Sequence, residues 1–326
     1  MYKSNFKVVT IGGGSGMPIV NKALVKSQIG WVNSIVTVFD SGGDTGRQRT
    51  DERGNLLAFS DYWRALMSLW IDGAQKSKWE ELLRFRDGRG RNFGNSFFVF
   101  LKEQVNEVNS VARWFGDLVM ADMAGEVIPV CLSPSNICFK VKSGAKFEGE
   151  HRLDELRMSQ DEVVKIWLDP SVVVNKRAVD VLAKADLIVV CPGSMYGSVL
   201  VNFMVDGFCQ AFIKSKAKKI LMTNVMSVRN ENHGFDQDKY IKVFEKYIGK
   251  KGIFDFCLMA DLTKLDKSIL KKVFGNYDFE YSKPIMYKKK SKNKVVLADI
   301  ATIDKKNLRL RHSVEKLANW FKSEFK

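Results

Sequence analysis

The chain has 326 residues, 45% of them hydrophobic and 27% charged, an ordinary globular composition that excludes a disordered chain or a coiled coil. Its formal net charge is +15, but residues 1–213 net only +1 and residues 214–326 net +14. In that last third 24 of the 27 basic residues are Lys, and no nucleic-acid-binding module accompanies them, so we expect no specific nucleic-acid partner.

Short apolar runs alternate along the chain with segments of helical spacing. Strands are expected at 6–11, 34–40, 127–133, 137–144, 145–153, 163–169, 186–192, 218–226, 254–260 and 294–300. Helices are expected at 18–27, 61–69, 79–83, 95–105, 177–184, 239–248 and 313–325, and the apolar run 198–213 is expected to be one buried helix. This alternation is typical of an α/β fold with a doubly wound, mostly parallel, Rossmann-like sheet. The closely spaced strands of 126–153 predict a small antiparallel excursion.

No linker rich in Pro, Ser or Gly interrupts the chain, so we expect a single domain over 1–326, with 214–326 as its Lys-rich C-terminal third. The apolar run at 6–11 is shorter than the core of a secretory signal, and no window approaches the ~18 apolar residues of a membrane span. The five cysteines form no CxxC pair and no metal-binding spacing, and we expect reduced core thiols. These features predict a cytoplasmic protein without a membrane span.

A glycine-rich loop lies between the first predicted strand and the first predicted helix. It reads IGGGSG and contains Gly12, Gly13, Gly14, Ser15 and Gly16. Glycines let backbone N–H groups approach a phosphate, and a helix N-terminus adds positive potential. The spacing matches neither the dinucleotide fingerprint G-x-G-x-x-G nor a Walker A loop. We therefore expect a nucleotide or sugar-phosphate site, with a tight turn that only packs strand against helix as the alternative.

A second loop, DSGGDTGRQR at 40–49, follows the second predicted strand. Asp40 closes that strand where a Rossmann fold carries the acid that binds ribose hydroxyls. Asp44 would hold a metal ion or a substrate hydroxyl. If the loop is extended, Arg47 and Arg49 would reach one anion, because Arg suits bidentate phosphate contact. The alternative is a polar turn with solvated arginines.

A third loop, CPGSMYGS at 191–198, follows the most hydrophobic predicted strand, which should be central in the sheet. It repeats the strand–glycine–helix arrangement of the first loop. Ligands of open α/β sheets bind outside the carboxyl ends of the strands, so three such loops indicate a ligand with two phosphates or an elongated nucleotide. The alternative is a helix cap, with Ser194 or Ser198 as the N-cap.

Two further segments carry polar residues at predicted element ends. FGNS at 93–96 opens a helix, and the preceding GRGR supplies Arg89 and Arg91. The segment NENHGFDQD contains His233, Asp236 and Asp238, which would bind a cation or act as a base. A cluster of this kind is more often a solvated loop, and we keep that interpretation as the favoured one.

Five segments in this order, IGGGSG, DSGGDTGRQR, RNFGNSFF, CPGSMYGSVLVNFMVDG and TNVMS, closely resemble the YvcK/CofD-like family, and the resemblance covers about residues 6–322. One group of that family resembles the 2-phospho-L-lactate transferase, which uses Mg²⁺ and a guanosine-diphosphate-linked donor. The other resembles the gluconeogenesis factor YvcK, a cytoplasmic protein of central metabolism and cell shape that binds UDP-sugars such as UDP-N-acetylglucosamine. The present sequence is more similar to the second group, whose loops read PGSLYTS and DDGGSSGR.

Some positions depart from the family pattern. Where the family reads roughly PPGDxRN, this chain reads FSDYWRA, so Asp61 matches but the arginine comes one position later, at Arg64. The resemblance and the loops together imply one set of ligand-binding candidates: Gly12, Gly13, Gly14, Ser15, Gly16, Asp40, Ser41, Gly42, Gly43, Arg47, Asn95, Gly193, Ser194, Met195, Tyr196, Ser198, Asn202 and Asn224.

The preferred interpretation is a nucleotide-sugar-binding regulatory protein that requires no cofactor. Backbone amides of 12–16 and 193–198 would hold the diphosphate, and Asp40 or Asn224 would contact ribose or base. The alternative is a Mg²⁺-dependent transferase in which Asp44 and Asp61 are the catalytic and metal-binding candidates. A dinucleotide oxidoreductase lacks a recognisable hydride-transfer site. A homodimer is the expected oligomer on general frequency alone.

Overall fold

The computed structural model describes residues 6–49, 56–71, 73, 75–105, 107–278 and 280–325. Seven strands form the central sheet: β1 (Lys7–Gly12), β2 (Trp31–Val36), β3 (Gly125–Pro129), β7 (Leu187–Val190), β8 (Lys218–Met222), β9 (Phe256–Ala260) and β10 (Val295–Ala298). Their order is β10-β9-β8-β7-β1-β2-β3, and all neighbours pair in parallel. The sheet grows from β1 toward β3 on one side and from β7 toward β10 on the other. The predicted doubly wound parallel sheet is therefore confirmed.

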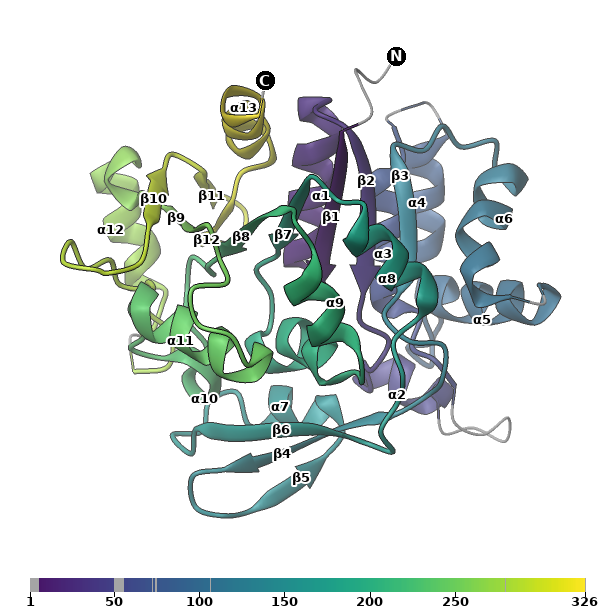
Figure 1. Cartoon of the computed structure of the whole chain (residues 1–326), viewed down its shortest axis with the longest axis horizontal. Helices are drawn as coiled ribbons and strands as arrows, with labels where there is room; N and C mark the ends of the chain where they lie inside the picture. Colours follow the sequence, from purple (N-terminus) through teal and green to yellow (C-terminus); the bar gives the residue numbers. More distant parts are fainter. Residues whose placement is uncertain are drawn as a thin grey trace.

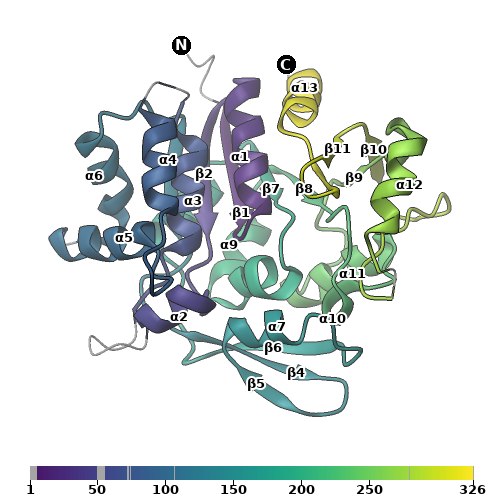
Figure 2. The same ribbon diagram turned by 180° about the vertical axis from the view of Figure 1, so that it is seen from behind.

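Helices cover both faces of this sheet (Figures 1 and 2). One face carries α1 (Gly16–Ser27), α3 (Ser60–Leu69) and α13 (Val314–Glu324), with α4 (Lys76–Arg84), α5 (Phe93–Gln104) and α6 (Val111–Leu118) packed outside α3. The other face carries α8 (Lys176–Ala183), α9 (Phe208–Lys214) and α11 (Gln237–Ile248). All four residues of β7 are fully buried, as expected for a central parallel strand covered on both sides.

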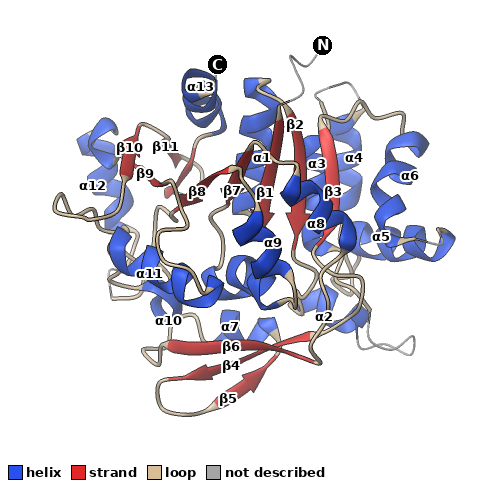
Figure 3. Ribbon diagram, in the orientation of Figure 1, coloured by secondary structure: helices blue, strands red, loops and turns tan. Residues whose placement is uncertain are grey.

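A second, antiparallel sheet of β4 (Asn136–Val141), β5 (Lys146–Glu148) and β6 (Val163–Asp169) lies beyond the carboxyl ends of the central strands, in the order β5-β4-β6 (Figure 3). Helix α7 (Glu150–Glu155) lies between this small sheet and the central one. The predicted small antiparallel excursion is therefore confirmed, although its strands differ from the expected ones. β3 belongs to the central sheet because its apolar residues are buried on both faces, and β6 replaces it in the small sheet. The expected strand at 145–153 ends at Gly149, whose φ of 94° starts α7.

The apolar run 198–213 is not the single helix that we expected. It continues a π-helical turn, η2 (Met195–Val199), through a 3-10 turn, η3 (Leu200–Met204), into α9. The Asn202 side chain donates to the carbonyls of Ser198 and Val199, and Gly207 takes a left-handed φ of 89°, so regular α-helical geometry is interrupted twice.

The structure also contains elements that the sequence pattern did not predict, most of them in the C-terminal third. The described residues also form α2 (Gly43–Arg49), α10 (Arg229–Asn232), α12 (Lys267–Gly275), the hairpin of β11 (Ala301–Asp304) and β12 (Arg309–His312), and the 3-10 turns η1 (Val108–Ser110) and η4 (Leu262–Lys264). Among the described residues, no helix has the length and apolar character needed to cross a membrane.

Candidate functional site

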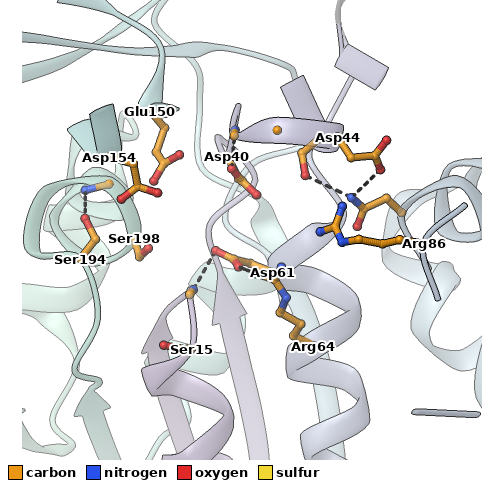
Figure 4. Close-up of a pocket in the computed structure, with 16 residues that line it drawn as sticks. Ser15, Asp40, Asp44, Asp61, Arg64, Arg86, Glu150, Asp154, Ser194 and Ser198 are labelled. Atoms are coloured by element: carbon orange, nitrogen blue, oxygen red, sulfur yellow. Dashed lines mark hydrogen bonds and ion pairs between the residues drawn. The ribbon is translucent and has the colours of Figure 1, made fainter. Parts of the chain in front are cut away.

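A pocket of about 440 Å³ lies at the carboxyl ends of β1, β2 and β7, where the strand order reverses. This is the place where open α/β sheets bind their ligands. The residues that line it come from the three predicted loops, α3, the connection between α4 and α5, α5, α7 and the start of η2: Gly14, Ser15, Asp40, Gly42, Gly43, Asp44, Thr45, Asp61, Arg64, Arg86, Asn95, Glu150, Asp154, Ser194, Gly197 and Ser198. We call it the switch-point pocket (Figure 4).

The loop between β1 and α1 meets the pocket through Gly14 and Ser15. Gly14 has a left-handed φ of 62°, and its N–H donates to the Asp61 carboxylate at 2.8 Å. Gly16 has a packing role instead, because a Cβ there would overlap the Pro192 carbonyl of the third loop. Gly12 and Gly13 also lie outside the pocket lining. Gly14 is thus the glycine of this loop that lines the pocket, whereas Gly16 allows the two loops to pack closely.

The loop after β7 is held from behind by Asn224. The Asn224 side chain donates to the Gly193 carbonyl at 2.8 Å and accepts from the Gly193 N–H at 3.1 Å. Tyr240 donates to the same Asn224 oxygen at 3.2 Å. Asn224 does not line the switch-point pocket, where we expected it to contact ribose or base. In this structure its side chain instead holds the loop after β7 through Gly193.

A buried carboxylate occupies part of the third loop. Glu231 of α10 accepts from the Ser194 hydroxyl and from the Met195 N–H, both at 2.6 Å. Burial raises the pKa of Glu231 to about 7, although these two donors oppose the shift. The Met195 amide, which we expected to bind a phosphate, is thus already paired. The segment 230–232 is buried, so the favoured interpretation of this cluster as a solvated loop was wrong.

Three other residues that we expected to bind the ligand are buried inside the protein. Met195, Tyr196 and Asn202 are buried, and the Tyr196 hydroxyl donates to the Val163 carbonyl at 3.2 Å. The third loop therefore reaches the pocket through Ser194, Gly197 and Ser198. Ser194 is the N-cap of η2, since its hydroxyl accepts from the Gly197 N–H, which agrees with the capping alternative.

The second loop is helical rather than extended, which corrects the expectation for its arginines. Arg49 is 2% exposed and donates to backbone carbonyls, among them those of Phe39 at 3.1 Å and Ser135 at 2.6 Å. Arg47 lies on the surface and reaches the Gly90 carbonyl at 3.3 Å. Residues two apart on a helix point in different directions, so these two cations do not share an anion. Ser41 likewise lies outside the pocket lining and pairs with His151 at 3.0 Å.

Asp44 organises the start of α5. Its Oδ2 accepts from the Gln48 side chain and the Asn92 N–H, both at 3.0 Å, and from the Asn95 side chain at 3.1 Å. Asn95 in turn accepts from the indole of Trp63 at 2.8 Å. The second oxygen, Oδ1, is buried without a hydrogen bond and lies 3.7 Å from Arg47.

The carboxylates of α7 lie on the side of the pocket away from Arg86, whereas Asp44 and Asp61 lie near guanidinium groups. Figure 4 shows Glu150 and Asp154 on one side and Arg86 on the other, with Asp40 and Asp61 between them. Burial, and then the nearby Asp40 carboxylate, raise the pKa of Asp61 to about 6 against the opposing effect of Arg64, which lies 3.2 Å away. Burial and Asp40 also raise the pKa of Glu150 well above its usual value. The pocket thus gathers acidic groups that repel one another.

Five residues of the lining were not among the candidates from the sequence: Thr45, Arg64, Arg86, Glu150 and Asp154. Glu150 and Asp154 lie on α7, where the expected strand 145–153 covers Glu150 and ends just before Asp154. No spacing in the sequence connects α7 with the glycine loops, because the small sheet brings it there only in the folded chain.

The described residues fit no ready-made metal site. They contain no group of three or more His, Cys, Asp or Glu side chains placed to hold a metal ion. Asp61 already accepts from Gly14 and Arg64, and Asp44 keeps only Oδ1 unpaired. The other cation candidates serve the fold: Asp236 caps α11 and pairs with Lys288, and Asp238 accepts from Ser291 at 2.5 Å.

The sequence and the fold both match known proteins. Residues 8–304 match the model of the family described as 2-phospho-L-lactate transferase CofD. The chain is 29% identical to a putative gluconeogenesis factor of Thermoanaerobacterium thermosulfurigenes, over 97% of this chain and 96% of that protein. It is 31% identical to the putative gluconeogenesis factor of Aquifex aeolicus, over 74% of each. A similar protein of Clostridium acetobutylicum is 30% identical over 82% of this chain, which spans 58% of that longer protein.

The fold is similar to the crystal structure of protein BH3568 from Bacillus halodurans. The TM-score is 0.84 at 22% sequence identity, and the alignment covers 97% of this chain and 99% of that one.

Proposed function

The chain belongs to the 2-phospho-L-lactate transferase CofD family, and from this premise we propose that it is a nucleotide-sugar-binding protein of the gluconeogenesis-factor type. One observation carries the proposal. Two glycine loops from adjacent parallel strands, one after β1 and one after β7, line a single pocket. The guanidinium groups of Arg64 and Arg86 and several carboxylates line the same pocket. Its volume of about 440 Å³ lies within the range of small-molecule sites.

The diphosphate would bind near the N-terminus of α1. The first N–H groups of a helix lack intrahelical acceptors and attract anions. Ser15 lies at this end, and Arg64 and Arg86 supply positive charge. The corresponding end of η2 is less suitable for a phosphate because Glu231 already accepts from Met195 there.

The sugar would bind on the opposite side of the pocket. Carboxylates repel phosphates but accept hydrogen bonds from hydroxyl groups. Glu150 and Asp154 lie there, close to Ser194 and Ser198 (Figure 4). This separation of charge favours a ligand with an anionic end and an uncharged, hydroxyl-rich end, as in UDP-N-acetylglucosamine. By binding such a ligand, the protein would regulate central carbon metabolism and cell-envelope formation according to the supply of nucleotide sugar.

Calorimetry and thermal shift with UDP-N-acetylglucosamine, UDP-glucose, GDP and NAD test this proposal. We expect the UDP-sugars to bind with a stoichiometry of one. Gly14→Ala should weaken binding, because Gly14 has a left-handed φ and a Cβ there would lie 3.1 Å from Ser198 Oγ. Gly88→Ala is the matched control, since no atom lies within 4 Å of its Cβ position. No heat and no thermal shift with any of the four compounds would refute the proposal.

A second candidate is a transferase that uses a nucleoside-diphosphate-linked phospholactyl donor with Mg²⁺. The observation that favours it is Asp61, a buried carboxyl in the pocket with a pKa of about 6, which would suit proton removal from an acceptor hydroxyl. Because the described residues hold no cluster of three or more metal-ligating side chains, Mg²⁺ would arrive with the diphosphate. If Asp61→Asn binds nucleotide normally and wild-type protein forms no product with any donor, with or without Mg²⁺, this candidate is excluded.

A further inference from the structure

A second cavity, of about 370 Å³, lies at the opposite edge of the central sheet, between the amino ends of β1 and β2 and helix α8. It is lined by Phe6 and by Lys7, Trp31, Asn33, Arg177, Val181 and Lys184. We call it the α8 cavity. The switch-point pocket lies at the carboxyl ends of the same strands, roughly 20 Å away for strands of six residues.

The sheet forms one side of the α8 cavity and α8 forms the other. Trp31 and Asn33 are two positions apart in β2, so their side chains lie on the same face of the sheet. Arg177, Val181 and Lys184 are four and three positions apart in α8, so they share one face of that helix. Figure 1 shows α8 in front of the sheet on this side.

Asn33 is the buried polar group of this cavity. It is 5% exposed, and among the residues that the structure describes its side chain has no hydrogen-bond partner. By contrast, the next residue of β2, Ser34, is bonded to Thr10 at 2.8 Å on the other face. The Asn33 amide is not sealed from solvent, because its atoms are not among the fully buried side-chain atoms without a hydrogen-bond partner, and it lines the cavity. A ligand in the cavity would replace water at this donor and acceptor.

The cavity also presents an aromatic surface and free positive charge. The indole of Trp31 is 43% exposed. In the described part of the chain, the ammonium groups of Lys7 and Lys184 have no ion-pair partner, whereas Arg177 is held by Glu126 at 2.5 Å. One further carboxylate, Asp186, accepts from the Lys7 backbone N–H at 2.7 Å. Asp180 of α8 also acts on Arg177, as Glu126 does. The lining itself contains three basic side chains and no carboxylate, so the inner surface of the cavity is positively charged.

We propose that the α8 cavity binds a small planar aromatic molecule that carries an anionic group. The ring stacks on Trp31, the polar edge of the ring bonds to Asn33, and the anion lies between Lys7 and Lys184. This site is independent of the switch-point pocket and of the ligand proposed there.

Titration calorimetry with AMP as the probe tests the proposal. AMP contains both an aromatic ring and an anionic group, and two of its fragments carry only one of them each. Adenosine has the ring without the anion, and ribose 5-phosphate has the anion without the ring. We expect AMP to bind at least tenfold more tightly than either fragment. AMP binding should persist in Gly14→Ala, which distinguishes this site from the switch-point pocket.

Matched substitutions locate the site. Trp31→Ala, Asn33→Ala and Lys184→Glu should each weaken AMP binding at least fivefold. The controls are Trp114→Ala, which removes an indole of similar exposure (41%) from α6, and Lys176→Glu, which changes an exposed lysine of the same helix. Lys184→Glu alters only an exposed side chain, so its effect is read without loss of fold. The proposal is overturned if AMP fails to bind at millimolar concentration, or if the controls lose binding as strongly as the cavity variants.

Discussion

The Ser194 hydroxyl donates to the Glu231 carboxylate at 2.6 Å, although the two residues are 37 positions apart in the chain. The adjacent Asn230 donates to the Leu153 carbonyl of α7 at 3.1 Å. The short helix α10 therefore connects two walls of the switch-point pocket, the loop after β7 and α7. Neither Asn230 nor Glu231 lines the pocket, but Glu231 holds Ser194, which does, and Asn230 holds α7, whose Glu150 and Asp154 do.

Glu231 makes the stability of the protein depend on pH. Its folded pKa of about 7 lies above the unfolded value of about 4.5. The folded state therefore binds the proton more tightly, and the free energy of unfolding should fall as pH rises from about 4.5 to 7. The expected loss from this group is about 3 kcal/mol at most. Urea denaturation across this range measures it.

Two variants isolate the contribution of Glu231. Glu231→Gln removes the titration but can still pair with Ser194 and Met195, so the fall should become shallower. Glu231→Ala leaves both donors unpaired and should destabilise the protein by about 1–3 kcal/mol at pH 7. If Glu231→Gln keeps the full wild-type slope, the assignment of this titration is wrong.

Asp61 should make ligand affinity depend on pH. It is largely protonated at pH 5.5 and ionised at pH 7.5, because its pKa is raised to about 6. The diphosphate of a UDP-sugar keeps its charge over this range, so it meets less repulsion at the lower pH. We expect binding of UDP-N-acetylglucosamine to be up to about tenfold tighter at pH 5.5, and the difference to shrink in Asp61→Asn. Equal pH dependence in both proteins, measured by calorimetry, would contradict this role.

The two sides of the pocket should discriminate between parts of the ligand. Arg86→Ala should weaken UDP and UDP-N-acetylglucosamine alike, by about tenfold, because both carry the diphosphate. Asp154→Ala should weaken only the nucleotide sugar, by a similar factor, because it removes an acceptor for sugar hydroxyls. Arg84→Ala, an exposed arginine outside the pocket, is the control. A loss of UDP binding in Asp154→Ala would show that the ligand lies the other way round.

The close packing of the two glycine loops predicts a stability effect separate from binding. Gly16→Ala would place a methyl group against the Pro192 carbonyl, which is backbone and cannot move aside cheaply. We expect the free energy of unfolding to fall by about 2 kcal/mol or more. Gly88→Ala should change it by less than about 0.5 kcal/mol. A Gly16→Ala protein as stable as wild type would show that the loops are less rigid than described.

Much of the fold followed from the sequence because parallel strands buried on both faces are short, apolar and bounded by glycine. The alternation of such runs with helical segments predicted the central sheet, and the loops after β1 and β7 predicted its ligand-binding edge. Ten of the predicted binding or metal candidates line the pocket; they lie in the loops after β1, β2 and β7 and at the starts of α2, α3 and α5: Gly14, Ser15, Asp40, Gly42, Gly43, Asp44, Asp61, Asn95, Ser194 and Ser198.

The positions of the other site residues depend on tertiary contacts. Arg49 and Asn224 have side chains suited to a ligand, but their partners are distant backbone groups that no local pattern reveals. Glu231 looked like part of a solvated loop because its neighbours are polar, and only burial against the loop after β7 shows its role. Glu150 and Asp154 were missed because strand and helix are hard to distinguish in a short charged segment.

A crystal structure of the protein with UDP-N-acetylglucosamine tests the central claim most directly. We expect the diphosphate to lie within hydrogen-bond distance of the first-turn amides of α1 and of Arg64 or Arg86. We also expect the sugar hydroxyls to face Glu150 and Asp154. A ligand bound outside the switch-point pocket, or one whose phosphates lie against Glu150 and Asp154, would contradict it.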